Sequence, residues 1–434
     1  MGVKILVIGL WHLGLVHCAC LPKLSHTVIG TDFDETRVEE ISGGKLPIYE
    51  PGLEELVNAH ISSGALSFSK LSPELLNTDF IFIAFDTPVD DNDVVDLSII
   101  DNSTDYLLEN LKPNENNEFP AIVMTSQVPV GTCRKLKGLF DKKFGEGKVK
   151  ISYVPENLRL NNAIKIFLEP DRMVFGVSDK EAEEKVLSVF DKIDCKKIVI
   201  RVESAEMSKH AMNAYLATCI SFSSELADLC ESVGANAFEV VETLKADSRV
   251  SPKAPILPGF GFAGGTLGRD IQTLRKLGEE NKIETALLDS VLSVNRNRIN
   301  ALLKKIRKKH KNLSGLTFGL LGLTYKPNTD TLRRSISLEI ASALKKEGAE
   351  VKAFDPKISE PSEDTKEIIL SKTADEAAKN CDALILATEW PEFKEIDFKK
   401  LGKAMKSPEI YDIKNFLDHK LLKSAGFEYY GMGV

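Results

Sequence analysis

The stretch VKILVIGLWHLG at residues 3–14 decides the fold. Residues 3–9 form a β-branched, nearly continuous apolar run, which is typical of a buried parallel strand. Gly9 then allows a tight turn and Gly14 allows close packing of the following helix, as in dinucleotide-binding turns, although Trp11 replaces the middle glycine of that pattern. The next strand, HTVIGTDFD at 26–34, contains Asp32, whose carboxylate would bind ribose hydroxyls and favour NAD over NADP. Arg37 weakens that preference because it could accept a 2′-phosphate, and a plain cap at the strand end is the alternative role of Asp32.

Further apolar runs at 80–85 and 121–126 alternate with helical stretches, and residues 151–200 complete this first lobe, which predicts a doubly wound parallel sheet. From Glu203 to about Val233 the sequence lacks Pro and Gly, which predicts one long helix that packs against other helices or a second subunit. From Leu316 onward the strand, helix and strand-plus-Asp layout of the N-terminus recurs. We therefore expect an α/β fold with two Rossmann-like doubly wound lobes joined by a long central helix and a helical middle domain, with domains at 1–200, 201–312 and 313–434.

Composition excludes several classes of function. The chain has 434 residues and a formal charge of −8, which argues against a broadly basic nucleic-acid surface. The basic run at 304–311 is interpreted as a solvated helix end in preference to a nucleic-acid patch. No apolar stretch is long enough to span a membrane. Seven scattered cysteines without a C-x-x-C pair indicate a reducing cytoplasm and no metal site.

Eight further blocks carry a family resemblance: PIYEPGLEELV (47–57), DTPVD (86–90), SQVPVGT (126–132), PENL (155–158), EMSKHAMNAYLATCISFSSELADLCESVGA (206–235), GFGFAGGTLGRD (259–270), GLTYKPNTDTLRRS (322–335) and TEWPEF (388–393). Together with the N-terminal turn they resemble the UDP-glucose/GDP-mannose dehydrogenase family over nearly the whole chain. The resemblance implies NAD in the N-terminal lobe, a UDP- or GDP-linked sugar between the middle and C-terminal parts, a homodimer or higher homo-oligomer formed through the long helix, and a role in polysaccharide biosynthesis.

The resemblance also implies roles for individual residues. Lys209 and Asn213 are four apart, so a helix projects them from one face, and with Asp270 they match the family's proton-transfer set. Glu156 matches the glutamate that activates water in the second half of the reaction. The cofactor-binding positions are Gly9, Trp11, His12, Leu13, Gly14, Asp32, Arg37, Thr87, Pro88, Ser126, Gln127, Arg269 and Arg333. The substrate-binding positions are Glu156, Leu160, Lys209, Asn213, Arg249, Phe260, Gly261, Phe262, Tyr325, Lys326 and Lys414.

Several positions depart from the family pattern. Thr266 stands where members that oxidise an alcohol to an acid have a cysteine, and a threonine hydroxyl is far too weakly acidic to replace a thiolate. Gln127, Leu160, Ser224 and Lys414 replace the usual Thr, Glu, Asn and Arg. The expected function is NAD-dependent oxidation of a hydroxyl group of a nucleotide sugar. The C6 hydroxyl of a UDP-glucose-type substrate is the preferred candidate, and the product is a uronic acid or, if the reaction stops earlier, the aldehyde. The alternative is a non-catalytic nucleotide-sugar binder. A β-hydroxyacid dehydrogenase would leave the C-terminal lobe unexplained.

Overall fold

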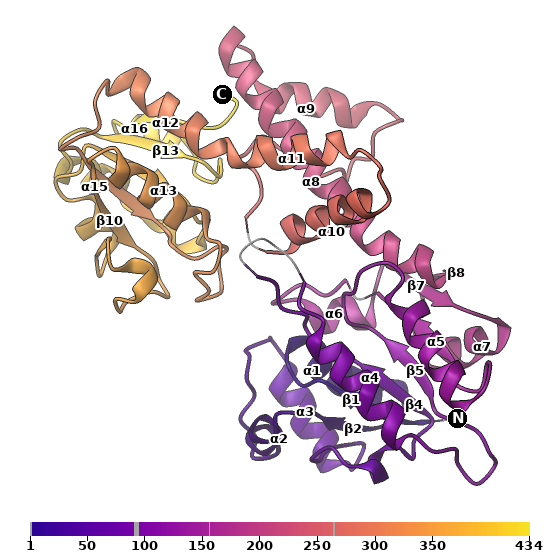
Figure 1. Ribbon diagram of the computed structural model, residues 1–434. Coiled ribbons are helices and arrows are strands. Elements are labelled where there is room, and N and C mark those ends of the chain that lie inside the picture. Colours follow the sequence, from indigo (N-terminus) through magenta and orange to yellow (C-terminus); the bar gives the residue numbers. More distant parts are fainter. Residues whose placement is uncertain (1, 91–94, 156, 264) are drawn as a thin grey trace. The chain divides into compact units, whose positions relative to one another are not determined.

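The computed structural model describes residues 2–90, 95–155, 157–263 and 265–434. The chain divides into two compact units, Met1–Ala211 and Met212–Val434, and the division falls inside the long helix α8 (Val202–Val233). Each unit contains one sheet flanked by helices (Figure 1). The prediction of two Rossmann-like lobes and a long central helix is confirmed, whereas the three domain boundaries stay predictions.

The first unit is built on an eight-stranded sheet in the order β3-β2-β1-β4-β5-β6-β7-β8. Its strands are β1 (Lys4–Ile8), β2 (Thr27–Thr31), β3 (Leu66–Phe68), β4 (Phe80–Ile83), β5 (Ala121–Met124), β6 (Ile151–Tyr153), β7 (Arg172–Val177) and β8 (Lys196–Arg201). Its helices before α8 are α1 (His12–Cys20), α2 (Glu35–Ser42), α3 (Leu53–Ser62), α4 (Ser98–Asn110), α5 (Thr132–Phe144), α6 (Ala163–Leu168) and α7 (Lys180–Val189), with 3₁₀ turns η1 (Leu21–Leu24) and η2 (Pro73–Leu76). The apolar runs read as parallel strands are buried along β1, β4 and β5.

One strand pair of this sheet departs from the expected parallel arrangement. β7 runs antiparallel to β6, while β7 and β8 are parallel to each other. The connection from β6 to β7 contains the six-residue helix α6, and β7 then enters the sheet in the opposite direction to β6. The sheet is therefore mixed at its far edge and parallel where the predicted cofactor residues lie.

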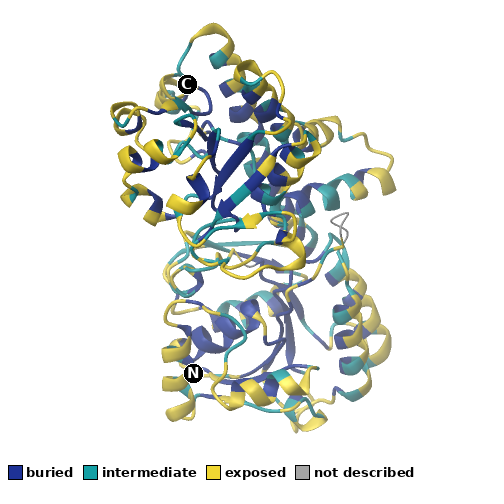
Figure 2. Ribbon diagram, turned by 90° about the vertical axis from the view of Figure 1, so that its left-hand side faces the viewer, coloured by how far each residue is buried: buried dark blue, intermediate teal, exposed yellow. Residues whose placement is uncertain are grey.

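The second unit contains a six-stranded parallel sheet in the order β11-β10-β9-β12-β13-β14. Its strands are β9 (Thr317–Leu321), β10 (Glu350–Phe354), β11 (Ile369–Leu370), β12 (Ala383–Leu386), β13 (Glu409–Asp412) and β14 (Glu428–Tyr430). Its helices are α9 (Ala237–Ala246), α10 (Thr266–Glu280), α11 (Ala286–Arg296), α12 (Arg298–Lys309), α13 (Ile336–Lys346), α14 (Ala374–Ala378), α15 (Phe398–Ala404) and α16 (His419–Ser424), with 3₁₀ turns η3 (Glu363–Thr365) and η4 (Pro391–Glu395). Figure 2 shows the central strands of each sheet buried and the outer faces of the flanking helices exposed.

The basic run at 304–311 lies at the end of the second of two helices, α11 and α12, which meet at Asn297. Several basic residues of α12 are paired with carboxylates: Lys305 lies 2.9 Å from Glu231, and Arg307 lies 2.6 Å from Glu347. These partners support the interpretation of the run as an ordinary helix end. In the described part of the chain no helix is long and apolar enough to cross a membrane.

Candidate functional site

The turn after β1 has the geometry of a dinucleotide-binding turn. Gly9 has φ +107°, and a Cβ added there would lie 2.8 Å from the carbonyl oxygen of Ala84. A Cβ added at Gly14 would collide with the carbonyl of Gly9, so both glycines are required for this packing. Trp11 occupies the N-cap of α1 without a side-chain cap on the helix. The amino end of α1 therefore offers backbone N–H groups and the positive end of the helix dipole, which fits a pyrophosphate.

Asp32 at the end of β2 holds this turn in place. Its Oδ2 accepts a hydrogen bond from the backbone N–H of Leu10 at 2.7 Å and from Arg37 at 3.1 Å, and the side chain is nearly fully buried. Arg37 also lies 3.4 Å from Asp34, and its guanidinium stacks over Trp11. Two carboxylates thus neutralise Arg37, which disfavours a second role as a 2′-phosphate ligand and agrees with NAD.

The loops after β4 and β5 meet the turn at the point where the strand order reverses, between β1 and β4. Thr87 Oγ1 donates to the carbonyl of Gln127 at 2.8 Å, and the N–H of Phe85 donates to Ser126 Oγ at 2.8 Å. The structure therefore brings the predicted Thr87, Ser126 and Gln127 together, whereas Pro88 is exposed beside them.

Asp86 is a residue of this site to which the sequence reasoning assigned no role. Its Oδ2 accepts the backbone N–H of Leu13 at 3.2 Å, so a carboxylate occupies one donor of the first turn of α1. That donor is among those a pyrophosphate would use. The block DTPVD contained the residue, but its reach to α1 depends on the pairing of β4 with β1, which the sequence alone does not show.

The side chain of His12 contacts the buried carboxylate of Glu50. Its Nε2 lies 3.1 Å from Glu50 Oε2, and Glu50 also accepts the backbone N–H groups of Asn161 and Ala163 at 2.9 Å each. Glu50 thereby connects His12, next to the glycine turn, with the start of α6. The half-buried Leu160 lies directly before this point in the chain. The predicted Glu156 lies outside the described residues.

The predicted proton-transfer residues come from α8 and α10. Asn213 Nδ2 donates a hydrogen bond to Asp270 Oδ2, and both side chains are buried, Asp270 completely. Lys209 is buried one turn earlier on α8, within the first unit. Thr266 is exposed at the first position of α10, one turn before Asp270. The structure thus joins Asn213 and Asp270 directly.

The predicted substrate residues Phe260, Gly261 and Phe262 form a loop held by side chains from other elements. Asn295 of α11 bonds both the N–H and the carbonyl of Phe262, at 2.8 and 3.0 Å. The ring of Phe260 is buried in the core with the guanidinium of Arg298 over it at 5.7 Å. The loop is therefore held both at the backbone of Phe262 and at the ring of Phe260.

The other predicted residues of the second unit are placed as follows. Burial raises the pKa of Tyr325, and Lys326 lies over its ring at 5.5 Å. Lys414 pairs with Glu389 at 3.1 Å. Arg249 is exposed and paired with Asp247, Arg333 is exposed, and Arg269 is half-buried. Their roles toward ligands stay predictions.

The seven cysteines are all free. Desolvation raises the pKa of Cys20 to about 12 and that of Cys381 to about 11, and burial likewise raises the pKa of Cys18, Cys133 and Cys195. These five thiols stay protonated at neutral pH and are poor nucleophiles. Among the described residues no group of three or more His, Cys, Asp or Glu could hold a metal ion.

Comparison with known proteins gives a consistent result. The UDP-glucose/GDP-mannose dehydrogenase family matches with its NAD binding domain at residues 3–194, its central domain at 203–297 and its UDP binding domain at 319–419. UDP-glucose 6-dehydrogenase of Rickettsia prowazekii is 34% identical over 99% of both chains. UDP-glucose 6-dehydrogenase TuaD of Bacillus subtilis is 32% identical over 99% of this chain and 93% of that protein. A solved UDP-glucose dehydrogenase from Pyrobaculum islandicum superimposes with a TM-score of 0.88 at 28% identity, covering 100% of this chain and 98% of the other.

Proposed function

Because the chain belongs to the UDP-glucose/GDP-mannose dehydrogenase family and is an NAD-dependent nucleotide-sugar dehydrogenase, we propose that it oxidises the C6 hydroxyl of UDP-glucose or a closely similar nucleotide sugar. The full-length similarity to UDP-glucose 6-dehydrogenases carries this choice of substrate. The product would be a building block for polysaccharide synthesis. The free cysteines support a reducing compartment such as the cytoplasm.

NAD held in the first lobe would supply the acceptor for the hydride that leaves the carbon carrying the hydroxyl group. The chain's own part in the first oxidation is to remove the hydroxyl proton, and Lys209, Asn213 and Asp270 are the proposed set. The bond from Asn213 to Asp270 supports this role, since it fixes the carboxylate in a site from which bulk water is excluded. Gly9, Gly14, Asp32 and the amino end of α1 would hold the cofactor.

The second oxidation, from aldehyde to acid, would proceed without a covalent enzyme intermediate. Thr266 provides no thiolate, and the raised pKa values of five cysteines make them unsuitable replacements. A water molecule activated by Glu156 would add to the aldehyde, and a second hydride transfer would give the carboxylate. Each sugar carried to the acid consumes one water and yields two NADH.

Counting NADH per molecule of UDP-glucose, with product masses, tests the proposal. Two NADH and a uronic acid support the direct-water route, and one NADH with a released aldehyde limits the reaction to the first step. A sugar adduct trapped on any cysteine would refute the direct-water route. If the protein binds UDP- or GDP-sugars measurably but forms NADH with none of a panel of them, the non-catalytic binder is favoured. The family comparisons do not support that alternative over the enzyme.

The homodimer predicted from the long helix also belongs to the proposal. Tyr215, Phe222 and Leu229 of α8 are 57%, 50% and 64% exposed. Their spacing of seven residues places them along one face of the helix. Such a stripe of large apolar side chains is typical of a surface that a partner covers, and a second copy of α8 would cover it symmetrically.

A further inference from the structure

The loop at residues 257–262, which contains the proposed substrate residues, is fixed at consecutive carbonyl groups by side chains from separate elements. Ser223 of α8 donates to the carbonyl of Leu257 at 2.9 Å. The hydroxyl of Ser224 is shared between the carbonyls of Ile220 at 2.9 Å and Gly259 at 3.3 Å. Between them, Asn415 from the loop after β13 donates to the carbonyl of Pro258 at 3.1 Å. The path of this loop therefore depends on contacts made outside the loop itself.

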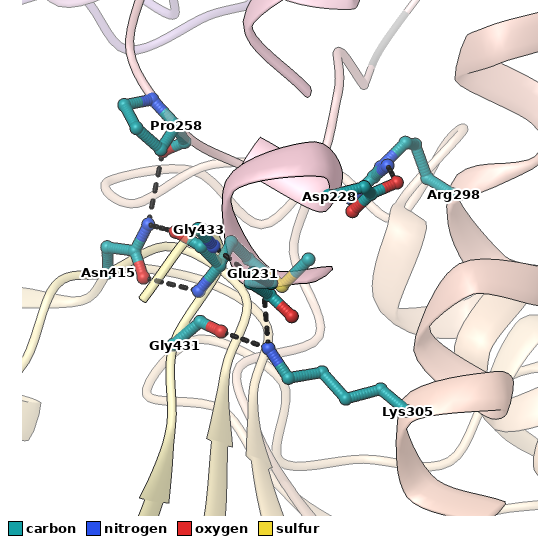
Figure 3. A network of polar contacts seen from close by, with 9 residues as sticks. Asp228, Glu231, Pro258, Arg298, Lys305, Asn415, Gly431 and Gly433 are labelled. Atoms are coloured by element: carbon teal, nitrogen blue, oxygen red, sulfur yellow. Dashed lines mark hydrogen bonds and ion pairs between the residues drawn. The ribbon is translucent and has the colours of Figure 1, made fainter. Parts of the chain in front are cut away.

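Asn415 bonds a second segment at the same time. Its Nδ2 also donates to the carbonyl of Met432 at 3.0 Å, and its Oδ1 accepts the N–H of Met432 at 2.8 Å. Figure 3 shows this amide between Pro258 and the segment at residues 431–433, which we call the clasp. The backbone of Asn415 has φ +50°, a left-handed conformation that Asn and Gly tolerate best. One side chain thus joins the substrate loop to the clasp.

The clasp is in turn docked on the helices of the second unit. The N–H of Gly433 donates to Glu231 Oε1 at 2.7 Å, and the carbonyl of Gly433 accepts the N–H of Ala237 at 2.8 Å. Lys305 bonds both Glu231, at 2.9 Å, and the carbonyl of Gly431 (Figure 3). Gly433 fits because it lacks a side chain: an added Cβ would lie 2.7 Å from Ala237 Cβ.

We propose that Asn415 and the clasp are positioning elements for the nucleotide-sugar site, because together they set the path of residues 257–262. The inference rests on the proposed function, in which this loop contacts the substrate. Binding of the nucleotide sugar is then coupled to docking of the clasp on α8, α9 and α12. Binding of NADH in the other lobe is not coupled to it.

The variant Asn415→Gly tests the inference, since glycine keeps the left-handed backbone and removes all three side-chain hydrogen bonds. Loss of a hydrogen bond that orders the loop predicts a rise of about tenfold in the Kd of UDP-glucose, with the Kd of NADH within about twofold of wild type. Amide hydrogen exchange in residues 257–262 should also accelerate. The matched control is Asn380→Gly, because Asn380 has φ +60° and is exposed in the same lobe.

A second variant, Gly433→Ala, keeps Asn415 and perturbs the clasp, because the added Cβ would lie 2.7 Å from Ala237 Cβ and 3.2 Å from Pro258 Cβ of the loop. It should raise the Kd of UDP-glucose in the same direction. The inference is overturned if Asn415→Gly leaves the Kd of UDP-glucose within about twofold of wild type. It is equally overturned if the Kd values for UDP-glucose and NADH rise together, or if Asn380→Gly has the same effect. Failure of the wild-type protein to bind any UDP- or GDP-sugar would instead refute the proposed function, and the inference with it.

Discussion

Replacing Asp86 by Asn should strengthen the binding of NADH. The Asp86 carboxylate accepts the N–H of Leu13 at 3.2 Å, so it occupies the amino end of α1 where the pyrophosphate of the cofactor would lie. Binding must then displace a carboxylate from a helix N-terminus and bring two like charges close together. Asparagine keeps the size of the side chain and removes the charge.

The size of the effect follows from two terms. A carboxylate at a helix N-terminus contributes about 0.3–1 kcal/mol, which the cofactor no longer has to overcome in the variant. Two like charges about 4 Å apart in water repel by about 1 kcal/mol, and solvent and salt reduce this at an exposed residue such as Asp86. Their sum, about 1–2 kcal/mol at low ionic strength, corresponds to a decrease in Kd of roughly five- to thirtyfold.

Fluorescence of Trp11 provides the assay, because this indole lies on the glycine turn and is 42% exposed, whereas Trp390 is 1% exposed in the other lobe. Quenching of Trp11 by NADH is followed at ionic strengths of about 0.02 and 0.5 M, and the advantage of Asp86→Asn should shrink at the higher value. Asp105→Asn, an exposed change of equal charge on α4, is the control. An unchanged or higher Kd in Asp86→Asn at low salt would show that the carboxylate does not compete with the cofactor.

Three further results are expected. Phe222→Glu should convert the proposed dimer to monomers in sedimentation velocity, whereas Leu421→Glu, at an equally exposed position, should not. A dimer that persists in Phe222→Glu would show that this face of α8 is not the dimer interface. Burial raises the pKa of Glu206, so the folded chain binds that proton more tightly than the unfolded chain does. The free energy of unfolding of the wild type should therefore fall relative to that of Glu206→Gln as pH rises from about 4.3 through the raised pKa. Denaturant titration at several pH values would measure this, and a difference that stays constant with pH would contradict it. Asn213→Ala, which leaves the buried carboxylate of Asp270 without this amide donor, should lower the free energy of unfolding by about 1–3 kcal/mol and reduce turnover, and unchanged values of both would argue against the pair.

Local patterns in the sequence were sufficient to predict the parts of the fold that depend on short stretches of chain. The strand and turn at residues 3–14, the repeated layout after Leu316 and the Pro- and Gly-free helix α8 all express constraints between near neighbours. The antiparallel pairing of β7 was not predictable in this way, because the paired residues Ser152 and Val177 are not near neighbours in the chain.

The side chains that hold the site were missed for a similar reason. Asn295 and Phe262 are 33 positions apart, and Glu231 and Gly433 are 202 positions apart. Nothing in the neighbourhood of either polar residue distinguishes it from an exposed helix residue. Asp270 was predicted only because a motif surrounds it, and its bond to Asn213 links positions separated by 57 residues.

The turn of the second lobe repeats that of the first, with one difference. Gly322 has φ +95°, and Asp355 Oδ2 accepts the N–H groups of Leu323 at 2.7 Å and Thr324 at 3.0 Å, much as Asp32 accepts that of Leu10. Asp355 Oδ2 also accepts the indole N–H of the buried Trp390 at 3.1 Å, whereas Asp32 Oδ2 accepts a hydrogen bond from the guanidinium of Arg37. The indole N–H of Trp390 thus occupies the carboxylate oxygen that corresponds to the one proposed to bind ribose hydroxyls of NAD in the first lobe. Although the polypeptide contains the same architectural unit twice, calorimetric titration should give a stoichiometry of one dinucleotide per chain.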